Sequence, residues 1–187
     1  MTPLLRAARE LQAFFEARQW RFCMIGGLAL LRWGEPRFTR DVDVTLLCSF
    51  GAEEEFVAPI LSSGYRGRIP DAAEFARSSR VLLVESAEGV PIDIALGGLP
   101  FEELMVERSS AFEFAPGCAL RTCSAEDLLI LKLFAFRPRD VLDAETVVVR
   151  QRGVLDWPYV ERHLAPLVEV KEKREIMETL ARLRGLQ

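Results

Sequence analysis

Residues 41–46 read Asp-Val-Asp-Val-Thr-Leu, a stretch in which acidic and apolar side chains alternate over the first four positions. Successive side chains of a β-strand point to opposite faces, so the alternation predicts a strand with one polar face. Asp41 and Asp43 therefore project on the same side. Two carboxylates this close repel each other by roughly a few kcal/mol, a cost that a divalent cation would remove.

A strand, a glycine turn and a helix are expected just before this stretch. The apolar run at residues 22–25 ends at Gly26 and Gly27, and residues 28–33 continue as a helix that stops at Gly34. Because glycine has no side chain, the backbone of this turn can approach a phosphate closely. The following helix would add the positive end of its dipole.

A third carboxylate, Asp93, lies between two isoleucines in a later apolar segment. Residues 80–85 and 90–96 flank a glycine-containing loop, which predicts a β-hairpin, and Pro91 is placed at the start of its second strand or at an unpaired edge. A carboxylate on a neighbouring strand would complete the oxygen ligands for one or two Mg²⁺ ions.

The rest of the chain is expected to be mostly helical. Ser124 starts a capping box for an apolar helix that ends near Phe136, and Asp156 is expected to cap a later helix. The fold class predicted is α+β, a mixed sheet of about four or five strands flanked by helices. A core over residues 1–120 would carry the carboxylates, and a helical part over residues 121–187 would close the cleft. The other helices expected cover residues 3–18, 53–62, 138–152 and 171–184.

At these residues the chain resembles the nucleotidyltransferase superfamily that includes DNA polymerase beta. The signature of that superfamily is a Gly-Gly or Gly-Ser turn, a spaced Asp-x-Asp and a third Asp on a later strand. The sequences Ile-Gly-Gly-Leu-Ala at 25–29 and Arg-Phe-Thr-Arg-Asp-Val-Asp-Val at 37–44 look most like bacterial AbiEii-type toxin nucleotidyltransferases and their uncharacterised relatives. Lys132 in a helix, followed by Arg139-Asp140 and Asp143, extends the resemblance to about residues 22–145.

The resemblance implies an enzyme that moves a nucleoside monophosphate from a nucleoside triphosphate to an acceptor hydroxyl, with two Mg²⁺ ions, or Mn²⁺ in their place. ATP is among the nucleotides that such an enzyme would bind. The residues that would bind metal and carry catalysis are Asp41, Asp43 and Asp93. The residues that would contact the nucleotide are Gly26, Gly27, Arg40, Lys132 and Asp140.

Lys132 and Asp140 also have structural interpretations that involve no contact with a nucleotide. Lys132 could be a lysine at the edge of a packed helix, or an ion-pair partner of Asp127 or Asp140. Arg139 and Asp143 are four residues apart, so they could form an ordinary helical ion pair. Asp140 lies in the same charged segment, so it is kept only as a supporting residue of the nucleotide site.

The acceptor is not specified by the charge of the chain. Its 24 Lys plus Arg residues against 28 Asp plus Glu residues give a net charge of −4, so a polyanion would need a local basic patch. Acceptors left open are RNA (tRNA among them), a protein, or a small molecule as in antibiotic-modifying enzymes. A catalytically inert nucleotide-binding or partner-binding module is the alternative outside the enzymes. The arginines that could supply the patch are Arg37, Arg40, Arg66, Arg68, Arg77 and Arg80.

The expected location is the cytoplasm. The N-terminus lacks the long apolar run of a secretory signal, and no run approaches the length of a membrane span. Four cysteines and one histidine do not match a familiar zinc spacing, so reduced, partly buried thiols are predicted. The resemblance also implies a toxin–antitoxin pair, in which the partner would be an antitoxin protein.

Overall fold

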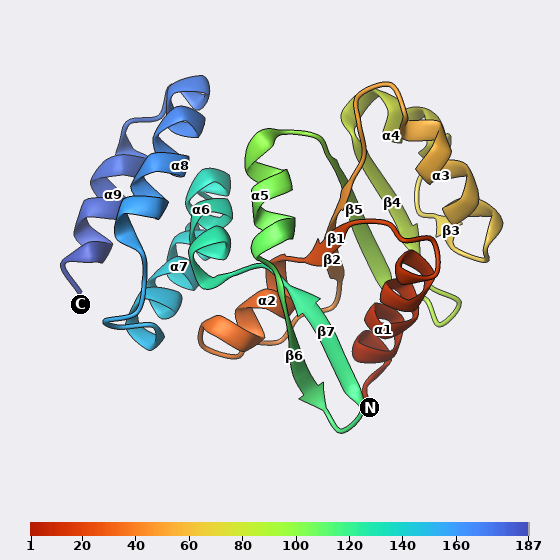
Figure 1. The fold of residues 1–187 in the computed structure, drawn as a ribbon, viewed down its shortest axis with the longest axis horizontal. Helices are drawn as coiled ribbons and strands as arrows, with labels where there is room; N and C mark the ends of the chain where they lie inside the picture. Colours follow the sequence, from red (N-terminus) through yellow and green to blue (C-terminus); the bar gives the residue numbers. More distant parts are fainter. Residues whose placement is uncertain (187) are drawn as a thin grey trace. The chain divides into compact units, whose positions relative to one another are not determined.

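A computed structural model describes residues 1–186, which form an α+β fold with one seven-stranded sheet and nine helices (Figure 1). The strands are β1 (Phe22–Met24), β2 (Val42–Leu47), β3 (Arg66–Gly67), β4 (Val81–Glu85), β5 (Pro91–Gly97), β6 (Ser110–Ala115) and β7 (Cys118–Thr122). The helices are α1 (Pro3–Glu16), α2 (Gly26–Trp33), α3 (Glu53–Ser62), α4 (Ala72–Ser79), α5 (Pro100–Arg108), α6 (Ala125–Ala135), α7 (Pro138–Arg150), α8 (Trp157–Lys171) and α9 (Glu175–Arg184).

The chain forms two compact units. The first comprises residues 1–28 and 38–123 and contains the whole sheet; the second comprises residues 29–37 and 124 onward and contains α6 to α9. The segment 29–37 belongs to the second unit because α7 and the residue after it hold it by hydrogen bonds. Glu35 donates its backbone N–H to Thr146 Oγ1 at 3.1 Å, and Gln151 donates its side-chain amide to the carbonyl of Trp33 at 3.0 Å.

The sheet is mixed, in the order β3-β4-β5-β2-β1-β7-β6. β2 runs parallel to β5 and antiparallel to β1, so the strand that begins with Val42 lies near the centre of the sheet. β1 and β7 form the second parallel pair, and the other neighbours are antiparallel. This topology is the mixed sheet expected from the sequence, although it has more strands than the four or five predicted.

Helices cover both faces of the sheet. Thr2 caps α1, and Phe15 of α1 packs with its ring centroid 5.2 Å from that of Phe22, whose register partner is Leu46. On the other face a Cβ built on Gly97 would lie 2.8 Å from Thr45 Cγ2 and 3.2 Å from a carboxyl carbon of α5. Leu46 and Thr45 are consecutive strand residues, so α1 and α5 lie on opposite faces.

The elements expected in the first unit are present, with four differences, one of which is that the two-residue strand β3 was not predicted. Pro91 is the first residue of β5, as predicted, but α2 begins at Gly26 itself and not after the glycine pair. The hairpin of β6 and β7 and the helices α4 and α5 were not predicted. The hairpin does have a sequence signal, because Pro116-Gly117 separates two runs of alternating side chains.

In the second unit Ser124 and Asp156 cap α6 and α8 through their side-chain oxygens, as the sequence indicated. The last helix is shorter than predicted, since α8 continues to Lys171 and α9 starts at Glu175. All four cysteines are buried and free of disulfide bonds, as predicted. Across the residues described, none of the helices has the length and apolar character that a bilayer crossing requires.

Candidate functional site

The carboxylates singled out in the sequence gather at the start of two adjacent parallel strands. Asp43 of β2 and Asp93 of β5 are direct register partners. Asp43 shares its side of the sheet with Thr45, which is the side covered by α5. Asp41 lies one residue before β2, and its charge raises the pKa of Asp93, so it is electrostatically coupled to this pair.

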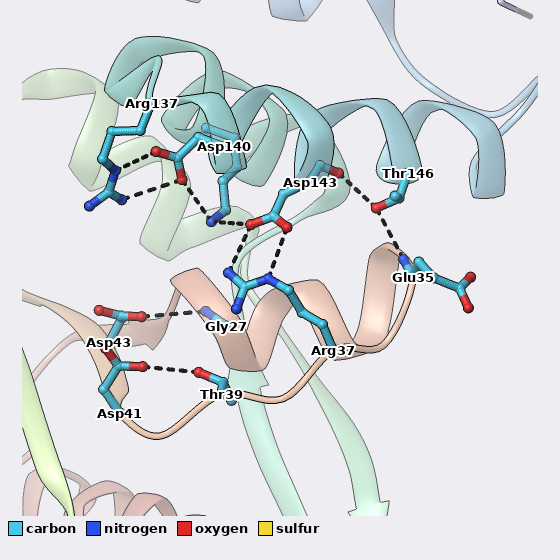
Figure 2. Close-up of polar contacts among 11 residues, drawn as sticks. Gly27, Glu35, Arg37, Thr39, Asp41, Asp43, Arg137, Asp140, Asp143 and Thr146 are labelled. Carbon is cyan, nitrogen blue, oxygen red and sulfur yellow. Dashed lines mark hydrogen bonds and ion pairs between the residues drawn. The ribbon is translucent and has the colours of Figure 1, made fainter.

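The two glycines are packed against these acidic residues. Gly26 has φ +55°, and a Cβ at this position would lie 2.0 Å from Asp43 Oδ2; a Cβ on Gly27 would lie 2.3 Å from Thr39 Oγ1. Gly27 donates its N–H to Asp43 Oδ2 at 3.3 Å, and Thr39 donates its hydroxyl to Asp41 at 2.9 Å (Figure 2). The glycines therefore make room for the chain's own carboxylate and threonine side chains.

Asp93 is held by an arginine. Arg68, the residue after β3, forms an ion pair with Asp93 through its guanidinium. Burial raises the pKa of Asp93 above its ordinary value, and the charge of Asp41 adds to this, although Arg68 acts in the opposite direction. Burial and Asp41 therefore disfavour the charged form of Asp93, whereas Arg68 favours it.

The three aspartates lie at backbone positions from which their carboxylates could bind a divalent cation. Carboxylate oxygens are the ligands that Mg²⁺ prefers, and Asp41, Asp43 and Asp93 supply them from adjacent segments. Their side chains are nevertheless engaged with local partners. Within residues 1–186 there is no group of three or more His, Cys, Asp or Glu side chains arranged to hold a metal ion. A cation here requires the side chains to turn toward one another, and Asp93 to release Arg68.

A second charged cluster lies in the second unit. Lys132 of α6 donates to Asp140 Oδ1 at 3.0 Å and lies 2.8 Å from Asp143 Oδ2, both on α7. Arg37 binds Asp143 through two hydrogen bonds of 2.9 Å, and Arg137 binds Asp140 (Figure 2). We call these five residues the lysine cluster; it contains three cations and two carboxylates.

The lysine cluster is buried around its ammonium group. The side chains of Lys132, Asp140 and Asp143 are 8%, 3% and 6% exposed. Burial by itself raises the pKa of the two aspartates, but hydrogen bonds from the arginines and from Lys132 outweigh it and lower the pKa below the ordinary value. Both carboxylates are therefore held in the charged form.

The structure divides the predicted site residues between these two places. Gly26, Gly27 and the three aspartates lie together in the first unit, whereas Lys132 and Asp140 lie in the lysine cluster. The ion pair of Lys132 with Asp140 agrees with one of the structural interpretations. Asp143 pairs with Lys132 and Arg37, and not with Arg139 as the helical spacing had indicated. Arg40 is exposed, with its guanidinium carbon 5.4 Å from the ring centroid of Phe38.

Four residues were not predicted to make these contacts: Thr39, Arg37, Arg68 and Arg137, although Arg37 and Arg68 were named as arginines of a possible basic patch. Thr39 and Arg37 lie in the segment that leads into Asp41, so the spacing Arg-x-Thr-x-Asp-x-Asp was an available signal. Arg68 has no local signal, because only the register of three strands, β3, β4 and β5, brings it to Asp93.

A family model matches most of the chain. Residues 8–147 match the model described as nucleotidyl transferase AbiEii toxin of type IV toxin–antitoxin systems. The matched range contains both clusters and the whole sheet. It confirms the resemblance stated from the sequence motifs. Among curated proteins, no significant sequence match to the chain was found.

Solved structures with similar folds are also nucleotidyltransferase-like. An antigenic nucleotidyltransferase-like protein from Paracoccidioides brasiliensis superposes with a TM-score of 0.54 at 14% identity, covering 95% of this chain and 91% of its own. The lincomycin-bound lincosamide antibiotic adenylyltransferase LnuA has a TM-score of 0.48 at 14% identity, covering 74% of this chain and 92% of its own. ANT(2″)-Ia in complex with adenylyl-2″-tobramycin has a TM-score of 0.49 at 16% identity, covering 97% of both chains. The first of these supports the fold class, and identities this low extend to the fold alone.

Proposed function

Since the chain belongs to the AbiEii family of nucleotidyltransferase toxins, we propose that it transfers a nucleoside monophosphate to a hydroxyl of RNA in a reaction that depends on Mg²⁺. The observation that carries the proposal is the register pairing of Asp43 with Asp93, with Asp41 and the glycine pair beside them. This placement offers carboxylate oxygens from two strands to one point, which is the donor chemistry that Mg²⁺ prefers.

The residues of the first unit have separate roles in this proposal. Asp41 and Asp43 hold the metal together with Asp93, and Mg²⁺ bound there would polarise the α-phosphate and the attacking hydroxyl. Asp93 is also the residue proposed to take the proton of that hydroxyl, because it is a carboxylate on the strand next to Asp43. Gly27 orients Asp43 through its N–H, and the start of α2 faces the triphosphate.

The lysine cluster, taken by itself, is proposed to bind phosphate groups. Its ammonium is engaged with two carboxylates, so the planar guanidinium of Arg137 is the group that would contact a phosphate. The side chain of Arg137 is 76% exposed and carries the accessible charge. Lys132 and Asp140 would act mainly by orienting Arg137 and α7, and Arg40 would reach the nucleotide from its exposed position.

RNA is favoured as the acceptor by the loop before Asp41. Phe38 is 75% exposed, and the guanidinium of Arg40 lies beside its ring. An exposed aromatic ring next to a cation stacks on an unpaired base and neutralises its phosphate.

A reaction with labelled nucleotides tests the proposal. The protein is incubated with each α-phosphate-labelled nucleoside triphosphate and Mg²⁺, in parallel with total RNA, with protein extract and with aminoglycoside or lincosamide antibiotics. We expect label in RNA, and loss of more than ~90% of it in a Phe38→Ala plus Arg40→Ala variant if stacking and charge each contribute about 1 kcal/mol. Label found only in protein, or only in an antibiotic, would show that this molecule, and not RNA, is the acceptor. No transfer from a protein that binds no triphosphate would favour an inert module.

We also propose that the protein acts in the cytoplasm and is controlled by a cognate antitoxin. Four free, buried cysteines suit a reducing compartment. The family description as part of a type IV toxin–antitoxin system supports an antitoxin encoded with it. Expression of the protein alone is expected to arrest growth, and co-expression of an antitoxin encoded beside it should relieve that arrest.

Gly26→Ala is expected to reduce transfer at least ~tenfold. Its new methyl group would collide with Asp43 Oδ2, in addition to the strain of a positive φ. Gly117→Ala is the matched control, because Gly117 has φ +72° and nothing within 4 Å of its Cβ position. In denaturant titrations Gly117→Ala should lose about 1 kcal/mol from the positive φ alone, and Gly26→Ala should lose more because the collision adds to that strain. Equal activity in the two variants would show that the packing of Gly26 on Asp43 does not matter for the reaction.

A further inference from the structure

Arg68 is placed on a metal-binding carboxylate by the architecture of the sheet. Its backbone N–H donates to the carbonyl of Leu83 at 3.0 Å, which continues the pairing of β3 with β4 by one residue. Leu83 is the register partner of Asp93, and Asp93 is the partner of Asp43. The four residues therefore form one row across four strands, with Arg68 at its outer end.

The contact between Arg68 and Asp93 is partly shielded and locally fixed. The side chains are 28% and 38% exposed. A Cβ on Gly67 would lie 2.8 Å from the Cβ of Ala72, so the chain just before Arg68 is packed closely against the start of α4. A freely moving surface arginine would have neither the backbone hydrogen bond nor this packing.

We propose that Arg68 is a positioning residue that occupies Asp93 until a divalent cation displaces it. The proposal rests on the function proposed above, because it takes Asp93 as a metal ligand. The guanidinium neutralises a carboxylate that lies beside two others, and it holds Asp93 in the row at which the metal arrives. A cation that binds Asp93 must take over the oxygen that Arg68 contacts.

Once displaced from Asp93, Arg68 can contact a phosphate of the nucleotide. The guanidinium released from Asp93 stays within one side-chain length of the carboxylates, and its planar donors match a phosphate. Metal binding and nucleotide binding are then linked. The metal displaces Arg68 from Asp93 and makes it available to a phosphate, and a phosphate that binds Arg68 leaves Asp93 available to the metal. A purely structural arginine would stabilise the sheet edge without changing the affinity for metal.

Binding of Mn²⁺ in the absence of nucleotide separates these roles, with the free-ion signal in electron paramagnetic resonance as the readout. We expect Arg68→Ala to bind Mn²⁺ about five- to tenfold more tightly than the unmodified chain, because a competing cation and its repulsion are removed. Arg68→Lys keeps the charge and should bind nearly as the unmodified chain does. In transfer assays Arg68→Ala should raise the KM for the triphosphate, whereas a loss confined to kcat would contradict the phosphate contact.

Arg66→Ala is the matched control. Arg66 lies two residues earlier, pairs with Glu85 at 2.8 Å and is 70% exposed, so its loss should change the Mn²⁺ affinity less than ~twofold. Unchanged or weaker Mn²⁺ binding by Arg68→Ala would overturn the inference while leaving the metal site intact. If the unmodified chain binds no Mn²⁺, or binds it equally well after Asp41→Asn plus Asp43→Asn, the proposed function fails and the inference fails with it.

Discussion

Replacing Asp43 by asparagine should lower the rate of nucleotidyl transfer about a thousandfold, which corresponds to about 4 kcal/mol of transition-state stabilisation. Asparagine keeps the shape of the side chain and can still accept the N–H of Gly27, but it removes one negative charge from the metal ligands. The loss should appear in kcat, because the carboxylate acts on the charge that develops during transfer.

Thermal unfolding and activity together make this test specific. Asp43→Asn should stay within about 1 kcal/mol of the stability of the unmodified chain, since asparagine keeps the oxygen that accepts the N–H of Gly27. Asp71→Asn is the control, because Asp71 is an exposed residue of the same unit with φ +54°, a conformation that asparagine tolerates. Full activity in Asp43→Asn would remove this residue from the reaction.

Lys132→Met should destabilise the protein by about 3 kcal/mol in denaturant titrations. The variant leaves Asp140 and Asp143 buried with one arginine each in place of two cationic partners. Removing one member of a buried ion pair is costly because the remaining charges lose compensation in a place that water does not reach. Methionine fills similar volume, so the loss would reflect charge and not a cavity.

A neutral version of the lysine cluster should recover most of that stability. In the triple variant Lys132→Met, Asp140→Asn and Asp143→Asn no carboxylate of the lysine cluster remains, and the side chains of Arg37 and Arg137 are 27% and 76% exposed to water. Arg139→Ala on the exposed face of α7 is the control and should change stability by less than about 0.5 kcal/mol. A triple variant as unstable as Lys132→Met would show that packing, and not charge, explains the loss.

The carboxylate site was predictable because its signals are local. The alternation around Asp41 and Asp43 specifies a strand and a face, and an aspartate between two isoleucines marks Asp93 as unusual. The glycine pair was also found, but its main contact was not. The sequence indicated space for a phosphate, and the structure shows that Asp43 and Thr39 take up the positions where the Cβ atoms would lie.

The remaining parts depended on contacts between distant residues. Arg68 reaches Asp93 only through the register of β3, β4 and β5, and a two-residue strand such as β3 has no periodicity to detect. Lys132 could be assigned a partner because Asp140 lies one helix later. Arg37 could not, because it precedes Asp143 by 106 residues.

The most direct test of the account is transfer of an α-phosphate label from a nucleoside triphosphate, measured with and without Mg²⁺, for the unmodified chain and for Asp41→Asn plus Asp43→Asn. The account predicts transfer that requires Mg²⁺ or Mn²⁺, stops with a chelator and falls below detection in the double variant, with thermal unfolding unchanged or shifted upward. Transfer that persists in the double variant, or that proceeds equally with a chelator present, would contradict it.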